Sequence, residues 1–406
     1  MTVHRRSGTT NQGTLHARGA ASSRFAPHPG STTMHAVNSF DERVLYRAGR
    51  VASALPVSIQ RALSGGPVVR EGSELEPELA LMMRLSGRTL SPLSTPLERY
   101  RAQQAKSARI AGGEPIVVGA VRDLTVDGAE GSLRARHYAP VVELDSSHPR
   151  PLLVYFHGGG FVFGDLDTHD APCRYICRYS GVHVLAVDYR LAPEHRFPAA
   201  PLDAFASFSW AKKHATSLGA DPDRVGVGGD SAGGNLAAVV SLMAREAGEV
   251  LPACQLLVYP PVDRRSHWRS VDSFGEGFFL TRSSIDWFDE QYGMHDADGS
   301  PDWRRNPLAA SSHAGLPPTY VATAGFDPLR DEGEAYADAL ARAGTPVSLR
   351  RFPEQLHGFV NMVGISRTAR DAVLEMAGAL RVLLHRPAAR PSREVRAPNV
   401  MEDAAR

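Results

Sequence analysis

The segment GDSAGG, residues 229–234, decides the fold of this chain. It follows the apolar run RVGVG, which predicts a buried strand, and precedes NLAAVVSLMAREA, which predicts a helix. In the pattern G-x-S-x-G the serine lies on a tight strand-to-helix turn, and small neighbours let the backbone bend and leave the hydroxyl exposed. An ordinary Gly-rich turn is the alternative, but the flanking strand and helix favour a nucleophilic serine, Ser231.

Strand-like and helix-like segments alternate on both sides of this turn. Continuous apolar runs predict buried strands at 152–156, 182–187, 224–227, 255–259, 319–322 and 348–352. Helical patterns lie near 168–180, 200–217, 232–247, 331–343 and 366–385. This alternation predicts an α/β fold with a mostly parallel sheet flanked by helices. Two earlier segments, 117–124 and 133–137, alternate in the manner of antiparallel strands.

The two ends of the chain differ from this central region. Residues 1–35 contain no acidic residue and little apolar content, which predicts a disordered tail, although a later start at Met34 would explain the same composition. Helical patterns without strand signals follow at 41–64, 74–87 and 95–112. Residues 386–406, rich in Pro, Arg and Ala, predict a second disordered tail. The folded region is therefore expected to span 36–385.

A glycine-rich segment, HGGG at 157–160, directly follows the predicted strand 152–156. A nucleophilic serine needs backbone N–H groups to bind the oxyanion that develops on the substrate, and glycines let the main chain approach it. A phosphate-binding loop is the alternative, but neither a following Lys-Ser/Thr nor a G-x-G-x-x-G spacing is present. HGGG upstream of the serine turn is instead typical of esterases and lipases.

Two further residues complete the order Ser, Asp, His along the chain. Asp327 and His357 each follow a predicted strand, so both are expected at the sheet edge where Ser231 emerges. Such a histidine takes the serine proton, while the aspartate fixes the tautomer of the histidine. Asp331 is the competing acid, but it begins a helical pattern, where Asp331 and Glu334 predict a helix-capping pair.

Five motifs together resemble the hormone-sensitive-lipase family of α/β-hydrolases, especially its bacterial carboxylesterase branch. They are HGGGFVFGDLDTHD (157–170), DYRLAPEHRFPAA (188–200), GDSAGGN (229–235), FDPLRDEG (326–333) and LHGF (356–359). The resemblance implies the α/β-hydrolase fold and a catalytic triad of Ser231, Asp327 and His357. It also implies that the oxyanion is bound by the N–H groups of Gly159, Gly160 and Ala232.

The same resemblance implies a helical cap built from 36–110 and 262–305. The second of these segments lies in an aromatic-rich stretch between Tyr259 and Thr319 that is longer than one helix needs, as expected for an insertion at the carboxyl edge of the sheet. Other polar clusters predict structure rather than chemistry. The spacing of Asp165, Asp167, His169 and Asp170 fails an EF-hand pattern, so we expect a turn and helix cap there and no metal.

The function implied by the resemblance is hydrolysis of short- to medium-chain carboxylic esters through an acyl-enzyme, without a cofactor. An amidase or acyltransferase uses the same triad, and a non-catalytic binding protein is a second alternative. The expected partner is a small ester; a formal charge of +1 gives no basis for nucleic acid, and no apolar run is long enough to span a membrane. Three cysteines fit a cytoplasmic location, and a homodimer stays open.

Overall fold

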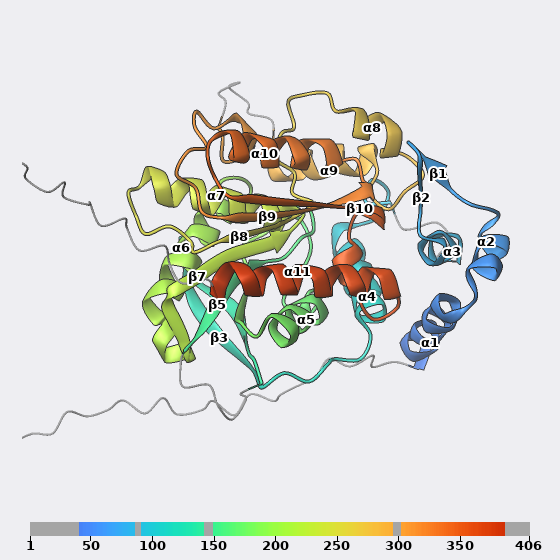
Figure 1. The fold of residues 1–406 in the computed structure, drawn as a ribbon, viewed down its shortest axis with the longest axis horizontal. Coiled ribbons are helices and arrows are strands. Elements are labelled where there is room, and N and C mark those ends of the chain that lie inside the picture. Colours follow the sequence, from blue (N-terminus) through green and yellow to red (C-terminus); the bar gives the residue numbers. More distant parts are fainter. Residues whose placement is uncertain (1–39, 86–90, 142–148, 295–301, 386–406) are drawn as a thin grey trace, which may run out of the picture. The chain divides into compact units, whose positions relative to one another are not determined.

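The computed structural model describes residues 40–85, 91–141, 149–294 and 302–385, so both predicted tails lie outside the described residues. An eight-stranded sheet has the order β10-β9-β8-β7-β5-β6-β4-β3 (Figure 1). Its strands are β3 (Ala120–Gly128), β4 (Gly131–Ala139), β5 (Arg150–Phe156), β6 (His183–Val187), β7 (Ala220–Asp230), β8 (Gln255–Val258), β9 (Thr319–Phe326) and β10 (Val347–Leu356). The β3–β4 and β4–β6 pairs are antiparallel and the others are parallel, which confirms the predicted mostly parallel sheet.

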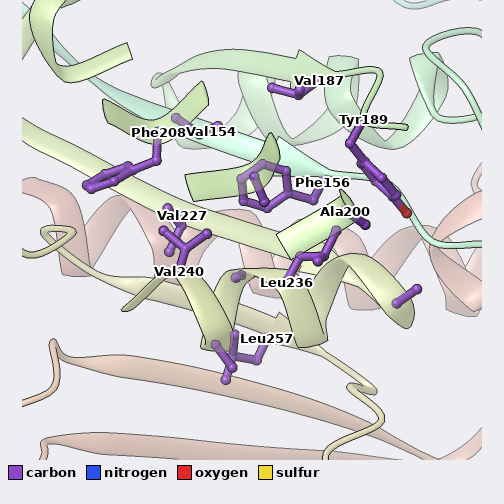
Figure 2. Packing of buried hydrophobic residues seen from close by; sticks show 14 of the residues in the cluster. Val154, Phe156, Val187, Tyr189, Ala200, Phe208, Val227, Leu236, Val240 and Leu257 are labelled. Atoms are coloured by element: carbon purple, nitrogen blue, oxygen red, sulfur yellow. The ribbon is translucent and has the colours of Figure 1, made fainter. Parts of the chain in front are cut away.

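Helices cover both faces of this sheet, which explains the continuous apolar runs of its central strands. Successive residues of β5 point to opposite faces: Val154 and Phe156 join one core cluster, whereas Tyr155 joins the other. The first cluster includes side chains from α6 (Ala199–His214), α7 (Ala232–Glu246) and α10 (Arg330–Arg342), and Figure 2 shows part of it. The second includes side chains from α5 (Asp170–Ser180) and α11 (Arg367–His385).

The predicted helical patterns before the sheet form α1 (Phe40–Ala54), α2 (Val57–Ser64), α3 (Pro77–Leu85) and α4 (Leu97–Gly112). The prediction that this region contains no strand is wrong. The strands β1 (Val69–Arg70) and β2 (Ser73–Glu74) form a short hairpin there. Its two turn residues, Glu71 and Gly72, have φ values of 48° and 80°. A two-residue turn with both φ positive suits a hairpin, but Glu-Gly is a weaker signal than Asn-Gly or Asp-Gly.

The insertion between β8 and β9 contains α8 (Arg269–Phe274) and α9 (Arg282–Tyr292). Short 3₁₀ helices complete the described elements: η1 (Ala215–Leu218), η2 (Pro307–Ala309) and η3 (Phe359–Met362). Across the described residues, none of the helices is long and apolar enough to cross a membrane.

Glu78 of α3 connects the N-terminal helices to the rest of the fold. Its carboxylate is completely buried and accepts hydrogen bonds from Ser53 of α1 and from Ser366, whose Oγ lies at 2.5 Å. It also accepts from the backbone N–H and the hydroxyl of Thr368, at the start of α11. A negative charge is favourable at a helix N-terminus, so this buried carboxylate stabilises three elements at once.

Glu78→Ala should lower the free energy of unfolding by about 3 kcal/mol, because it leaves several buried donors without an acceptor. Urea denaturation of the full chain measures this cost. Glu74→Ala is the matched control, since Glu74 forms only an exposed ion pair with Arg61 and should cost far less. Equal costs for the two variants would contradict the role assigned to Glu78.

Candidate active site

Ser231 lies at the junction of β7 and α7 in a conformation that few residues adopt, with φ 54° and ψ −123°. Its backbone N–H donates to the carbonyl of Val258 at 2.8 Å, which fixes the turn against the neighbouring strand β8. A Cβ on either Gly229 or Gly233 would collide with the carbonyl oxygen of Phe156. The two glycines of the motif are therefore required because strand β5 passes directly beside the turn.

The structure brings Ser231, His357 and Asp327 into one hydrogen-bonded row. His357 Nε2 lies 2.9 Å from Ser231 Oγ, and His357 Nδ1 lies 2.7 Å from Asp327 Oδ2. Asp327 is completely buried, and its other oxygen accepts the N–H of Leu329 at 2.8 Å. With Nδ1 protonated towards Asp327, Nε2 can accept the proton of the serine hydroxyl. Tyr259 packs against His357, with ring centroids 4.5 Å apart.

The competing acid, Asp331, has a different environment from the one predicted. The helix-capping pair with Glu334 is wrong: Leu329 occupies the N-cap of α10, and it makes no side-chain capping bond within the described chain. Asp331 instead accepts the N–H of Ser270 at 2.9 Å and pairs with Arg330 at 2.8 Å. This acid holds α8 against α10, because the start of α10 lies under the insertion rather than at the surface.

The loop that is predicted to bind the oxyanion (the oxyanion loop, residues 157–160) follows β5 and lies beside Ser231. Gly159 and Gly160 have φ values of 121° and 59°, and both line the same cavity as Ser231 and Ala232. A Cβ on Gly160 would come 2.5 Å from the ring of Phe288, so α9 packs directly on this loop. The three predicted oxyanion-binding residues are thus brought to the serine.

His157, the first residue of the oxyanion loop, is buried beneath it. Its ring stacks on that of Tyr189 with centroids 4.4 Å apart, and the Tyr189 hydroxyl donates to the His157 carbonyl at 2.8 Å. Burial lowers the pKa of His157 to about 4, which keeps the imidazole neutral at neutral pH. Its role in the structure is to support the loop from below.

Asp230 is a site residue that the sequence analysis missed. Its buried carboxylate accepts the N–H of Gly158 at 3.1 Å and the hydroxyl of Tyr155 at 2.7 Å, and it pairs with His169 at 3.3 Å. Burial alone would raise the pKa of Asp230, but His169 and the Tyr155 hydroxyl hold this pKa below its ordinary value. The sequence did contain a signal for Asp230, because a charged residue that lies between a buried strand and the predicted nucleophile needs polar partners.

His169 extends this network to the loop that follows the triad histidine. Its Nε2 lies 3.2 Å from Nδ2 of Asn361, and its Nδ1 lies 2.9 Å from the hydroxyl of Thr168. These three side chains and Asp230 line the same cavity as Ser231. The polar network therefore connects the serine turn, the oxyanion loop and the segment after His357.

The acidic cluster at 165–170 forms a turn, as expected. Asp165 accepts the N–H groups of Asp167 and Thr168 at 3.0 and 2.7 Å, whereas Arg136 pairs with Asp167 and Asp170. The predicted helix cap is wrong, because α5 has no side-chain capping bond among the described residues. The described part of the chain contains no group of three or more His, Cys, Asp or Glu arranged for a metal ion.

A cavity of about 460 Å³ opens above Ser231. Helix α4 and the segment 278–294 supply much of its wall, so elements from both predicted cap segments face the triad. Several aromatic rings of the wall lie close together: the ring centroids of Tyr100 and Phe163 are 5.6 Å apart, and those of Phe163 and Phe288 are 5.9 Å apart. The Ser231 hydroxyl, the His357 imidazole and the backbone of residues 158–160 therefore lie together at the bottom of a mainly apolar cavity.

Comparison with known proteins identifies the class. The family model described as alpha/beta hydrolase fold matches residues 153–361, which include every residue of the predicted triad and of the oxyanion loop. This chain belongs to the α/β-hydrolase family, and the resemblance to its hormone-sensitive-lipase branch is confirmed.

Curated relatives and solved structures agree with this class. The chain is 45% identical over 347 residues to carboxylic ester hydrolase LipN of Mycobacterium tuberculosis, covering 83% of this chain and 91% of that protein. It is 34% identical to an ethyl acetate hydrolase of Pseudomonas putida, covering 75% and 98%. Among solved structures, the esterase of Pyrobaculum calidifontis is similar with a TM-score of 0.71 at 38% identity, covering 76% and 98%.

Asp327→Asn should lower kcat steeply, by up to about 10⁴-fold, because the wrong histidine tautomer would then face the serine. Asp331→Asn should leave kcat nearly unchanged and cost on the order of 1 kcal/mol of stability, since asparagine still accepts the N–H of Ser270. Ester turnover and melting temperature of the two variants, measured side by side, test the assignment. Loss of turnover in Asp331→Asn alone would reverse it.

Proposed function

We propose that this protein is a serine carboxylesterase that hydrolyses small carboxylic esters through an acyl-enzyme intermediate. The single observation that carries the proposal is the hydrogen-bonded row of Ser231, His357 and Asp327 at the bottom of an apolar cavity. The names of the relatives, which are ester hydrolases and esterases, support the same reaction. Three buried, free cysteines suit a reducing cytoplasm, where we place the protein.

Acylation begins at Ser231. Its Oγ attacks the ester carbonyl carbon while Nε2 of His357 takes the hydroxyl proton, and Asp327 stabilises the resulting imidazolium. Negative charge then develops on the carbonyl oxygen, which accepts the N–H groups of Gly159, Gly160 and Ala232. Collapse of the tetrahedral intermediate breaks the bond to the alcohol oxygen, and His357 gives its proton to that oxygen as the alcohol leaves.

Deacylation repeats these steps with water. His357, neutral again, takes a proton from a water molecule that attacks the acyl carbon, and the same backbone N–H groups hold the second oxyanion. The second intermediate collapses to the free acid, and His357 returns the proton to Ser231 Oγ. Asp230 contributes by holding the N–H of Gly158, so the adjacent donors of the oxyanion loop are already oriented before substrate binds.

We assign residues 36–385 to one hydrolase domain, with a cap formed by 36–110 and 262–305. The support is that α4 and α9 contribute wall residues to the cavity, whereas the sheet contributes the triad. Phe288 of α9 packs on Gly160, so the position of the cap and that of the oxyanion loop depend on each other. An apolar cavity of about 460 Å³ favours acyl chains of short to medium length.

Ser231→Ala should lower hydrolysis of p-nitrophenyl butyrate by at least about 10³-fold, because the nucleophile and its base act as a unit. Ser241→Ala is the matched control: Ser241 lies on the same helix, is buried, and bonds only within the helix through Ala237. It should keep near-normal turnover. A folded Ser231→Ala protein with normal turnover would reject the mechanism. If the wild type cleaved the butyryl anilide faster than the butyryl ester, the protein would be an amidase instead.

Among p-nitrophenyl esters from acetate to palmitate, kcat/KM should be highest at about C2–C8 and fall at least about tenfold by C16, because the cavity cannot enclose the longer chain. The panel is run below the aggregation concentration of each ester. Comparable kcat/KM for butyrate and palmitate would contradict a size limit set by the cavity.

A further inference from the structure

Exposed apolar side chains concentrate on the two first helices. Of sixteen large apolar residues that are exposed in the described chain, seven lie between residues 40 and 63: Phe40, Val44, Leu45, Val51, Val57, Ile59 and Leu63. Such residues are unremarkable when scattered singly, but a group this dense on adjacent helices marks a surface that binds something. Phe40, Val44 and Val51 share one side of α1, and we call these three residues the apolar face.

Helix α1 carries apolar residues on a side that does not pack against the rest of the described chain. Phe40, Val44 and Val51 follow one another at spacings of four and seven residues, which places them on one side of the helix. They are 74%, 48% and 63% exposed. The buried Glu42 and Ser53 lie on the opposite side of the helix. The outward residues therefore stay available for a partner.

Positive charge borders the apolar face. Arg43, Arg47 and Arg50 are exposed and recur at helical spacing along one side of the Phe40–Val51 stripe. Within Phe40–Ala54 the acids are Asp41 and the buried Glu42, which pairs with Arg109. The preceding segment, residues 1–39, contains four arginines and no Asp, Glu or Lys. The region from the first residue to the end of α1 is thus strongly basic.

We propose that α1 docks on the surface of an anionic lipid bilayer through this apolar face. A helix that lies in the bilayer interface places apolar side chains among the acyl chains and basic side chains against the phosphates beside them. The apolar face and its arginine border have this arrangement. Clusters of arginine near a membrane surface add electrostatic attraction to anionic lipids.

A second copy of the chain fits this surface less well. In a two-fold symmetric dimer the same patch meets itself, so the arginine border of one helix would face the equivalent positive surface of the other. Asp41 is the single exposed acid of α1 that could offset this charge. Like charges brought together at an interface oppose association, whereas anionic headgroups neutralise them.

Docking there would bring the substrate cavity close to lipid. Helix α1 packs on α4 through contacts such as Tyr46 against Gly113 and the Arg109–Glu42 ion pair at 2.9 Å. Residues of α4 in turn line the cavity, and the half-exposed Phe279 lines it as well. Given the proposed esterase activity, this position suits esters that partition into membranes. The docking itself does not depend on that activity.

Co-sedimentation of the full chain with phosphatidylcholine vesicles, with and without phosphatidylglycerol, tests the proposal. We expect the partition coefficient to rise at least about tenfold with phosphatidylglycerol and to fall again in high salt. The double variant Val44→Asp/Val51→Asp should lose most of this binding. The control Val250→Asp/Val382→Asp adds the same charge at exposed sites outside α1 and α2 and should bind more tightly than that variant.

Hydrolysis of p-nitrophenyl acetate in the absence of vesicles should be unchanged in both double variants, which reports that they are folded; circular dichroism serves if no hydrolysis is found in the wild type. Equal vesicle binding by the two double variants would overturn the proposal. A partition coefficient that is the same with and without phosphatidylglycerol would overturn it too. Light scattering of the wild type and of the Val44→Asp/Val51→Asp variant tests the alternative that the chain forms a dimer. A wild-type dimer that Val44→Asp/Val51→Asp converts to monomer would assign the apolar face to a second copy.

Discussion

The close passage of strand β5 beside the turn at Ser231 is the constraint on which the rest of the site depends. The Phe156 carbonyl leaves no room for a side chain on Gly229 or Gly233, and the chain must turn within the space of one residue. Ser231 takes the positive φ that results, a conformation that costs energy and persists only where surrounding contacts fix it. Those contacts come from the parallel pairing of β7 with β5 and β8.

The same proximity explains why the oxyanion loop follows β5. Because β5 and β7 are neighbours, the residues after β5 emerge directly beside the serine, and one carboxylate, Asp230, can hold Gly158 without a long connection. Asp230 is costly to bury, yet its pKa stays low because His169 and Tyr155 surround it. The network thereby fixes the loop after β5 relative to Ser231, as the proposed binding of an oxyanion by backbone N–H groups of this loop requires.

Periodicity and motifs predicted most of the fold, because both depend on local sequence. Every predicted strand from 152 onward and the helices between them are present, and the row of Ser231, His357 and Asp327 follows from their order along parallel strands. Tertiary partners could not be predicted in this way. Asp331 binds Ser270 of α8, sixty-one positions away, rather than capping its own helix, and Asp230 finds partners on two other segments.

The N-terminal helices also show that local sequence does not predict tertiary contacts. Local pattern located α1, but its amphipathic period does not say which side faces the protein. The answer comes from buried polar contacts: Ser53 bonds to Glu78 and Glu42 pairs with Arg109, so this side of the helix is committed to the fold. Phe40, Val44 and Val51 are therefore left outward. Polar contacts of Glu42 and Ser53 thus hold α1 to the fold together with the buried Ala52, so they decide which of its apolar residues stay exposed.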